Sequence, residues 1–455
     1  MKNVIDYRIE AEYFLSKFIT NDEILDSIET VDAAELISLS SGKAFRSKEF
    51  NTDKDIKIAK IGDVTNQRSP AKWDFVSEQE LNYQKANYLN KNDIIQTLTG
   101  DPPDVGKVHM VGESNYPMTW NQRVAKIVLK NSGIYNQASL FAVLSSEVCR
   151  LQLERYAKGI RQRNLGAESV KWMKIPKLPK SLQELISKAV NKSNKLLEKS
   201  LSCDLRAEKR LLEIIGVSKF KPPTKKSSTL SFKESFIATG RLDAEHYQPK
   251  FEQLKSIISQ HFEIESLSTL LSVNMRGTQP KYSSNGLVVI NSKHVKRGEV
   301  DLSDNRFAIQ KSKEHLTIQK GDVLLNGTGV GTIGRASPYN HDQKALPDNH
   351  VTILRTNKIN PVYLSVFLNS FVGQYQVEKY LKGSSGQVEL YPKDIGHFYI
   401  PMIDEEQQEE IAKLANQTFD YREISQSLMN SSKKAVDIFI LKGEEAANSY
   451  LRGKL

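Results

Sequence analysis

Apolar residues recur at helical spacing in two long stretches of the chain, and each stretch follows an Ile-Pro pair. The first stretch runs from Pro176 to about Ile215, and the second runs from Pro401 to about Leu441. Proline is tolerated at the start of a helix because its missing N–H would have no partner there. Two helices of about 35 residues would each reach roughly 50 Å. The pattern predicts that their apolar stripes pack against each other, with two unrelated surface helices as the alternative.

Ahead of each long stretch, short apolar runs alternate with turn residues, which is typical of a sheet with irregular loops. The first such region spans about Leu36 to Leu129 and is followed by a helical pattern near Ser139 to Tyr156. Residues 216–235 (GVSKFKPPTKKSSTLSFKES) are rich in Pro, Lys and Ser. This composition indicates an exposed linker and a domain boundary.

After the linker, short landmarks recur in the same order at an offset that falls from about 233 to about 224 residues. The matched pairs are Arg8–Glu12 with Arg241–Glu245, Lys91–Ile95 with Lys320–Leu324, Thr99-Gly100 with Thr328-Gly329, Gly106-Lys107 with Gly334-Arg335, and Tyr156–Gly159 with Tyr380–Gly383. Because the repeat is far longer than a solenoid repeat, we predict the duplication of a whole domain. The expected fold is α+β, with two pseudo-repeated globular domains each followed by a long helix.

The duplication divides the chain into six predicted parts. These are globular domain 1–178, long helix 179–216, linker 217–235, globular domain 236–400, long helix 401–442 and C-terminal tail 443–455. Each globular part is long enough to bury a hydrophobic core of its own.

The chain has 455 residues and a formal net charge of +10. Between Lys171 and Lys233 there are 16 Lys and Arg residues against five Asp and Glu residues. The positive charge is therefore concentrated on the first long helix and the linker. This suggests an acidic partner, although many basic proteins bind none.

Nothing in the sequence indicates export or a membrane anchor. No apolar run approaches the ~18 residues that a membrane span needs, and the charged start MKNVIDYRIEAEYF is not a secretory signal. Cys149 and Cys203 lie far apart and match no metal-ligand spacing. We expect a cytoplasmic protein with reduced cysteines.

Two motifs invite an enzymatic interpretation. Gly329–Gly334 has the G-x-G-x-x-G pattern of dinucleotide sites, but Ser337-Pro338 disfavours the helix that such a site needs. We interpret the segment as a glycine-rich turn between two strands. Asp101–Asp104 resembles the Asp-Pro-Pro-aromatic motif of amino-group DNA methyltransferases, but Asp104 cannot stack on a flipped base. The histidines form no ligand cluster, so we predict a non-catalytic chain that binds neither metal nor cofactor.

Another set of segments follows a fixed order in the second half. They are Arg241–Pro249 (RLDAEHYQP), Lys320–Leu325 (KGDVLL), Gly331–Arg335 (GTIGR), Leu381–Gln387 (LKGSSGQ), Asp394-Ile395, and Ile400-Pro401 leading to Glu406–Gln408. In this order they resemble the specificity (DNA-recognition) subunit of type I restriction–modification systems. The first half fits more loosely, through Lys60–Asn66 and Ile175-Pro176, and lacks the Gly-Thr-Ile-Gly-Arg turn and the Ser-Ser-Gly loop.

The resemblance implies that residues 1–178 and 236–400 are target-recognition domains, held apart by two antiparallel helices that act as a ruler. Each domain would read one half of a split, asymmetric site in double-stranded DNA. Methyltransferase subunits, usually two, would dock on this chain and carry S-adenosylmethionine, and a restriction/translocase subunit would join for restriction. The competing class is a duplicated scaffold that binds RNA or non-specific DNA.

Lys and Arg neutralise phosphates, whereas amide and guanidinium groups read base edges. On this basis the candidate DNA-binding residues of the first domain are Thr65, Asn66, Gln67, Arg68, Lys107, His109, Arg161, Gln162, Arg163 and Asn164. Those of the second domain are Lys293, His294, Arg297, Arg335, Ser384, Ser385 and Gln387. The loop Arg161–Asn164 is favoured because it places two guanidiniums and two amides in four residues. For each residue the alternative is an ordinary solvated surface loop.

Overall fold

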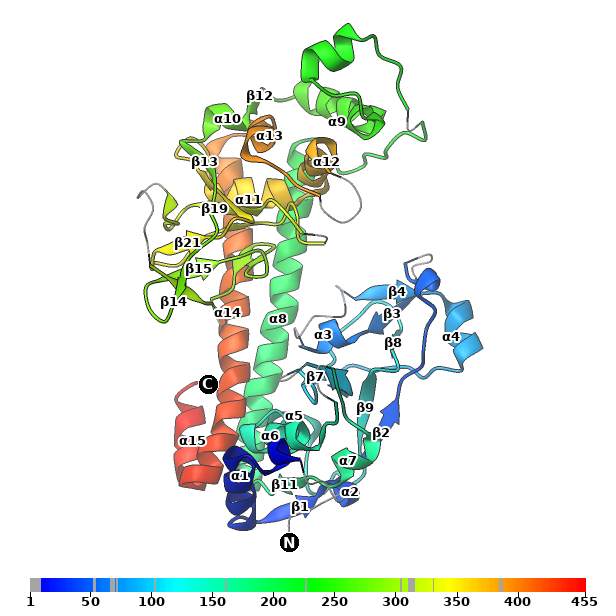
Figure 1. Cartoon of the computed structure of the whole chain (residues 1–455), viewed down its shortest axis with the longest axis vertical. Coiled ribbons are helices and arrows are strands. Elements are labelled where there is room, and N and C mark those ends of the chain that lie inside the picture. The colour runs from blue at the N-terminus through cyan, green and yellow to red at the C-terminus, as the bar shows by residue number, and fades with distance from the viewer. Residues whose placement is uncertain are drawn as a thin grey trace. The chain divides into compact units, whose positions relative to one another are not determined.

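The computed structural model describes residues 10–51, 55–65, 70, 73–101, 104–159, 162–225, 227–302, 305–309, 316–329, 331–383 and 388–455. The chain forms two compact units. Unit 1 consists of Met1–Glu198 with Arg422–Leu455, and unit 2 consists of Lys199–Tyr421. Two long helices, α8 (Lys180–Ile214) and α14 (Glu405–Lys442), contribute residues to both units (Figure 1). The predicted α+β class with two long helices is confirmed.

Unit 1 contains an antiparallel sheet and a smaller mixed sheet. The antiparallel sheet has the order β2 (Ile37–Ser41), β9 (Val124–Leu129), β5 (Ile94–Thr97) and β7 (Val108–Met110). The mixed sheet has the order β4 (Asp74–Val76), β3 (Ile56–Ala59) and β8 (Met118–Trp120), with β3 parallel to β8. The smaller elements are η1 (Ala11–Phe14), α1 (Ser16–Asp26), β1 (Thr30–Asp32), α2 (Ala33–Leu36), η2 (Ser47–Glu49), α3 (Ile61–Thr65), α4 (Glu78–Gln84), β6 (Thr99–Gly100), β10 (Arg163–Asn164), α7 (Ala167–Lys171) and β11 (Lys174–Pro176).

The core of unit 1 forms where α5 (Gln137–Leu144) and α6 (Glu147–Tyr156) meet the long helices. Phe141 and Leu153 are fully buried there together with Ile186 of α8 and Val436 of α14. Apolar positions at helical spacing on all four helices lead to this common core, because each helix must cover its apolar stripe.

Unit 2 repeats this architecture. Its antiparallel sheet has the order β13 (Val273–Arg276), β22 (Val351–Arg355), β19 (Val323–Asn326) and β20 (Ala336–Pro338). Its second sheet has the order β14 (Tyr282–Ser283), β18 (Phe307–Ala308), β15 (Leu287–Ile290) and β21 (Ala345–Pro347), with β15 parallel to β21. The smaller elements are η4 (Lys233–Ile237), η5 (Ala244–Tyr247), α9 (Pro249–Ser259), β12 (Ile264–Ser266), α10 (Leu267–Leu270), β16 (Val295–Lys296), β17 (Glu299–Val300), α11 (Pro361–Asn369), α12 (Phe371–Tyr380), α13 (Pro392–Gly396) and β23 (Tyr399–Pro401).

The duplication extends to individual side-chain hydrogen bonds. In unit 1 the amide of Gln152 bonds to both backbone groups of Lys174, at 2.9 Å and 2.8 Å. In unit 2 the amide of Gln376 bonds to both backbone groups of Tyr399, at 3.1 Å and 2.7 Å. These bonds attach α6 and α12 to the Ile-Pro strands β11 and β23. The predicted repeat is thus confirmed at the level of buried polar contacts, which cost free energy when unpaired.

Each repeat also needs a glycine where two chain segments cross. A Cβ on Gly42 would lie 2.2 Å from the carbonyl oxygen of Asn121, and one on Gly277 would lie 2.3 Å from that of Asp348. Any side chain would force the backbones apart, so the close approach explains why both repeats have glycine here.

The long helices run antiparallel in both units. In unit 1 the hydroxyl of Ser193 donates to the carbonyl oxygen of Ser425 at 2.8 Å. In unit 2 the hydroxyl of Thr418 donates to the carbonyl oxygen of Ser200 at 3.3 Å, and Arg210 forms an ion pair with Glu410 at 2.9 Å. As the residue number rises along α8, the partner's number falls along α14. Small buried hydroxyl side chains allow the two backbones to approach closely.

The structure differs from the predicted boundaries in two respects. Ile175-Pro176 and Ile400-Pro401 lie in strands β11 and β23, which pair with β1 and β12, so the long helices begin at Lys180 and Glu405. The predicted C-terminal tail contains a helix, α15 (Glu444–Arg452). Its buried Leu451 belongs to the core of unit 1. The apolar spacing in this segment was too short to predict a helix by itself.

Candidate nucleic-acid interface

The predicted DNA-binding residues fall on three pairs of equivalent segments, one of each pair in each unit. The first pair follows the parallel strands β3 and β15. Thr65 ends α3 after β3, while Asn66, Gln67 and Arg68 lie outside the described residues. Lys293 is exposed in the turn after β15. The segments after β3 and β15 share little sequence beyond the buried Val64 and Val295. The sequence therefore did not reveal that these two segments are equivalent.

Both predicted histidines are buried. His109 on β7 is 5% exposed and is paired with Ile95 of the neighbouring strand β5. His294 is 3% exposed, and its Nδ1 accepts a hydrogen bond from the backbone N–H of Asn291 at 3.1 Å. Neither side chain is available to DNA in this conformation. The residues next to His109 and His294 in the sequence do not indicate whether a histidine is buried or exposed.

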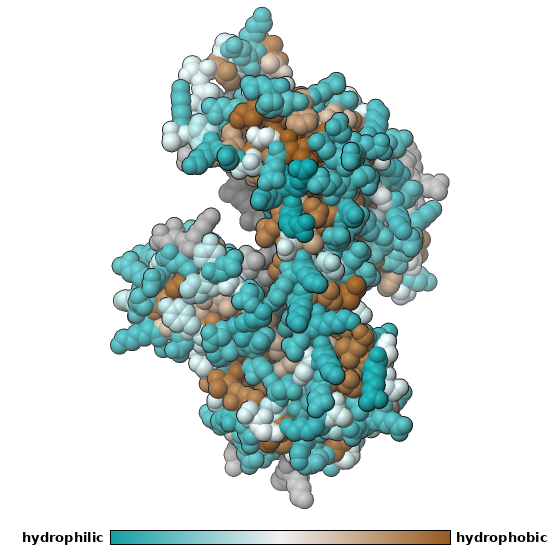
Figure 2. Space-filling model, turned by 180° about the vertical axis from the view of Figure 1, so that it is seen from behind, coloured by the Kyte–Doolittle hydropathy of each residue, from teal (hydrophilic) through white to brown (hydrophobic). Residues whose placement is uncertain are grey.

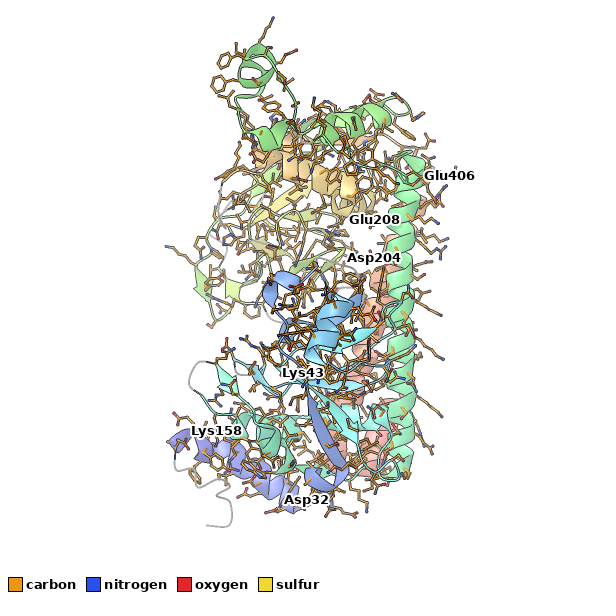
Figure 3. All side chains as sticks on the ribbon, turned by 90° about the vertical axis from the view of Figure 1, so that its right-hand side faces the viewer. Asp32, Lys43, Lys158, Asp204, Glu208 and Glu406 are labelled. Atoms are coloured by element: carbon orange, nitrogen blue, oxygen red, sulfur yellow. The ribbon has the colours of Figure 1, made fainter. Side chains whose placement is uncertain are left out.

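Two predicted cations lie next to the long helices. Arg297 occupies the β16–β17 turn near Glu208 of α8, which is labelled in Figure 3. Burial raises the pKa of the Glu208 carboxyl, and Arg297 acts against the rise. Lys107 forms an ion pair with Asp104 at 2.7 Å and lies near Lys433 of α14, whose pKa is lowered chiefly by burial and also by Lys107. These placements favour a role in holding the β16–β17 turn and the segment before β7 against the helices.

Half-buried carboxylates of the long helices also hold the helices that lead to the third pair of segments. Asp437 of α14 accepts a hydrogen bond from the backbone N–H of Glu147, the first residue of α6, at 3.2 Å. Glu208 of α8 accepts one from the backbone N–H of Phe371, the first residue of α12. A carboxylate suits a helix N-terminus because free N–H groups and the helix dipole both favour negative charge.

The pKa of Asp437 is raised by burial, which outweighs the lowering by the hydrogen bond from the backbone N–H of Glu147. Since the folded protein then holds a proton that the unfolded chain has released, stability falls as pH rises between the two pKa values. We expect Asp437→Asn to remove this slope, because an amide oxygen still accepts the Glu147 N–H. Thermal melts at about pH 4 and about pH 7 should show that the melting temperature of the variant, relative to that of the wild type, is higher at pH 7 than at pH 4. Equal slopes for the two proteins would contradict this account.

The second pair of segments comprises the turns that follow β5 and β19. Gly329, Gly331 and Gly334 have positive φ, and the turn leads from β19 into β20. No helix follows the glycines in this described part of the chain, so the interpretation as a turn between strands is confirmed. Arg335 is half-buried, and its Nη2 donates to the carbonyl oxygen of Gly331. The guanidinium therefore closes the turn on itself.

The third pair of segments joins the second in a small hydrogen-bonded ladder. In unit 1 the N–H of Leu98 donates to the carbonyl of Arg123 at 2.9 Å, and the N–H of Leu165 donates to the carbonyl of Leu98 at 2.7 Å. Asn164 pairs with Thr99 through β6 and β10 and exchanges backbone bonds with Lys158 at 2.7 Å and 2.9 Å. We call Arg123, Thr99, Asn164 and Lys158, with the backbone that links them, ladder 1. Lys158 is labelled in Figure 3.

Unit 2 has the same hydrogen bonds at the equivalent places. The N–H of Gly327 donates to the carbonyl of His350 at 2.8 Å, and the N–H of Leu390 donates to the carbonyl of Gly327 at 2.8 Å. Glu389 pairs with Thr328 and exchanges backbone bonds with Lys382 at 2.8 Å and 2.9 Å. We call His350, Thr328, Glu389 and Lys382, with their linking backbone, ladder 2.

Two of the remaining predicted residues, Gln162 and Arg163, are described and lie beside ladder 1. Gln162 is exposed, and Arg163 is half-buried with its Nη1 donating to the carbonyl oxygen of Glu154 at 3.1 Å. Arg161, Ser384, Ser385 and Gln387 lie outside the described residues. The described residues on either side of these loops, Lys158 and Asn164 in unit 1 and Lys382 and Glu389 in unit 2, make the same backbone hydrogen bonds in the two repeats.

The sequence analysis did not pair Arg123 with His350, which accept the equivalent backbone hydrogen bonds in the two ladders. The available signal was an Asn-x-Arg segment at Asn121–Arg123 and an Asp-x-His segment at Asp348–His350. In each, the first side chain accepts a hydrogen bond from the backbone N–H two residues later, at 3.1 Å and 2.9 Å. Such short side-chain-to-backbone turns are common in loops, so the signal gains meaning only when both copies are aligned.

Among the described residues, no group of three His, Cys, Asp or Glu residues could hold a metal ion. In the same part of the chain, no helix is long and apolar enough to cross a membrane. The face drawn in Figure 2 is mainly hydrophilic, with separate apolar patches.

The sequence of this chain is similar to those of several known proteins. Residues 26–202 match the family described as type I restriction modification DNA specificity domain. The EcoBI specificity subunit of Escherichia coli is 23% identical over 438 residues, covering 91% of this chain and 84% of that subunit. The EcoKI specificity subunit of E. coli is 27% identical over 195 residues, covering 41% of each chain. The predicted resemblance to type I specificity subunits is thus confirmed.

Two other similarities extend the range of relatives. The MjaVIII specificity subunit of Methanocaldococcus jannaschii is 26% identical over 208 residues, covering 44% of this chain and 48% of that subunit. Among solved structures, the type I S subunit of M. genitalium has a TM-score of 0.42 at 14% identity, covering 90% of this chain and 94% of that one.

Proposed function

We propose that this chain, whose residues 26–202 belong to the type I restriction modification DNA specificity domain family, recognises a split, asymmetric site in double-stranded DNA. The observation that supports this most directly is the repeated ladder. One framework occurs twice, with the same backbone hydrogen bonds but different residues at two of its four named positions, where Arg123 and Asn164 of ladder 1 stand opposite His350 and Glu389 of ladder 2. Two similar readers with different contact residues suit a site made of two unlike half-sites.

Each recognition domain needs two kinds of contact with DNA. Cations neutralise phosphates and fix the register of the protein, while side chains that reach base edges supply the sequence preference. The exposed Lys158 and Lys382 suit the first task. The amide, carboxylate and guanidinium groups of the ladders suit the second.

The long helices suit a role as spacer. Each one contributes residues to both units, and the antiparallel pairs Ser193–Ser425 and Ser200–Thr418 hold them together. In this proposal the helices set the number of unread base pairs between the half-sites.

The chain itself supplies recognition in this proposal, and partner subunits supply chemistry. Methyltransferase subunits carry S-adenosylmethionine and methylate the chosen site, and a restriction/translocase subunit acts where the site is unmethylated. The basic first helix and linker, with 16 Lys and Arg against five Asp and Glu between Lys171 and Lys233, suit contact with acidic partners or DNA.

The test is to map methylated bases by sequencing DNA from cells that contain the methyltransferase subunit with or without this chain. We expect methylation at one split sequence only when the chain is present. Methylation that is absent or scattered in both cases would overturn the proposal. A preference of the purified chain for RNA or single strands over duplex would favour the scaffold alternative.

A further inference from the structure

The two ladders have the same backbone but differ at two of their four named positions. Thr99 and Lys158 of ladder 1 correspond to Thr328 and Lys382 of ladder 2, so these positions keep the same residue types. Arg123 corresponds to His350, and Asn164 corresponds to Glu389. The hydroxyls of Thr99 and Thr328 are inside the framework, since the first is buried and the second lies 2.6 Å from Nδ1 of His350. Lys158 and Lys382 are exposed, Lys382 beside its ion-pair partner Asp394, and they suit contacts that every duplex offers, namely phosphates. The positions that differ are where two half-sites can be distinguished.

The differing side chains of ladder 1 are available for contact. Arg123 and Asn164 are both exposed. Among the described residues, the structure gives neither side chain a hydrogen bond or an ion pair. Arg is the best partner for the O6 and N7 acceptors of guanine, and Asn is the best partner for N6 and N7 of adenine.

The carboxylate of Glu389 in ladder 2 is held in place by neighbouring side chains and still has acceptor sites for a further hydrogen bond. Its Oε1 lies 3.6 Å from Nη2 of Arg276, which is a long ion pair. It also accepts a hydrogen bond from Tyr391, which raises the pKa of that exposed phenol. A carboxylate has about four acceptor sites, so capacity remains. Since a carboxylate only accepts hydrogen bonds, its complement in the major groove is the N4 amino donor of cytosine.

The side chain of His350 has a different task. Its Nδ1 lies 2.6 Å from the hydroxyl oxygen of Thr328, and the two side chains therefore fix each other. Ladder 2 is thus more strongly held by its own side chains than ladder 1, where the hydroxyl of Thr99 has no partner among the described residues.

We infer that Arg123 and Asn164 read a guanine and an adenine in one half-site, and that Glu389 reads a cytosine in the other. This inference rests on the proposed function. It assigns the base preference to the ladder positions that differ between repeats, and assigns phosphate contact to the Lys positions that do not differ.

The test uses near-isosteric exchanges in the full chain together with its methyltransferase subunit. Glu389→Gln turns an acceptor-only group into one that matches adenine, and Asn164→Asp does the reverse. We expect E389Q to change the preferred base pair at one position of one half-site from C·G towards A·T. We expect N164D to change one position of the other half-site from A·T towards C·G. Each change in preference should be about 5- to 150-fold, the range of one base contact.

Two controls keep the result interpretable. Arg150→Gln removes an arginine from α6 that is ion-paired with Glu147 at 2.7 Å, and it should leave the methylated sequence unchanged. Thermal melts of E389Q and N164D check that both variants fold. Selection of random duplexes by the purified full chain provides a readout that does not need the methyltransferase.

The outcomes separate the two proposals. If the wild type selects and directs methylation to a split duplex site that E389Q and N164D leave unaltered, the ladder assignment is overturned and the proposed function stands. If the wild type selects no duplex sequence and directs no site-specific methylation, both are overturned. A change confined to the predicted half-site in each variant supports both.

Discussion

Four residues inserted into each long helix are expected to lengthen the unread spacer of the DNA site by one to two base pairs, with both half-sites unchanged. The insertion points are after Glu198 in α8 and after Tyr421 in α14, where each helix passes from one unit to the other. Four residues add roughly 6 Å and about one helical turn, and one base-pair step rises about 3.4 Å. Equal insertions keep the Ser193–Ser425 and Ser200–Thr418 contacts paired.

Methylated-site sequencing measures the result directly. As a matched control, the same four residues inserted into the linker after Pro223 lie outside both helices and should leave the spacer unchanged. Should the helix insertions preserve methylation with the original spacing, the helices are not the ruler. Should the linker insertion change the spacing, the linker determines it instead.

Arg163→Ala is expected to relax the half-site read by unit 1 and to lower methylation of the full site roughly 10- to 100-fold. The structure gives Arg163 an anchoring role, because its Nη1 donates to the carbonyl oxygen of Glu154 near the end of α6. A hydrogen bond from a charged donor is worth about 1.5–3 kcal/mol, and a cation near a helix C-terminus is further favoured by the dipole. Without the anchor, the segment that holds Asn164 loses its fixed position.

The control for this variant is Lys171→Ala. Lys171 is an exposed cation of the same unit, ion-paired with Glu168 at 2.6 Å, and an exposed pair contributes little. Duplex binding by the purified chain distinguishes the mechanisms. A loss that is uniform across all sequences would mean that Arg163 is only a phosphate contact, which would contradict the anchoring role.

In the third pair of segments, local sequence patterns predicted one part of each ladder but not its partner across the ladder. Tyr156–Gly159 and Tyr380–Gly383 were matched from the sequence, and the structure places both at the entrance to equivalent ladders. The carbonyl groups across each ladder belong to Arg123 and His350, which are different residue types. Two-residue strands such as β6 and β10 have no periodicity to detect, so their register is visible only after folding.

Burial is the second point at which local patterns fail. His109, His294 and Arg297 are ordinary polar residues in loops and short strands when considered in sequence. Only their neighbours decide whether each one is a surface contact, a core residue or a partner of a helix carboxylate. Those neighbours are far away in the chain, as Glu208 is from Arg297.

The sequence by itself determined the duplication, the two long helices, the glycine-rich turn and the family resemblance. These features follow from spacing and order along the chain, which hydrophobic periodicity and backbone requirements express locally. Only the tertiary structure decided which of the predicted side chains reach the surface, and that the dissimilar residues Arg123 and His350 occupy the same place in the two repeats. Such facts depend on hydrogen bonds and packing between distant segments, and these contacts form only when the cores assemble.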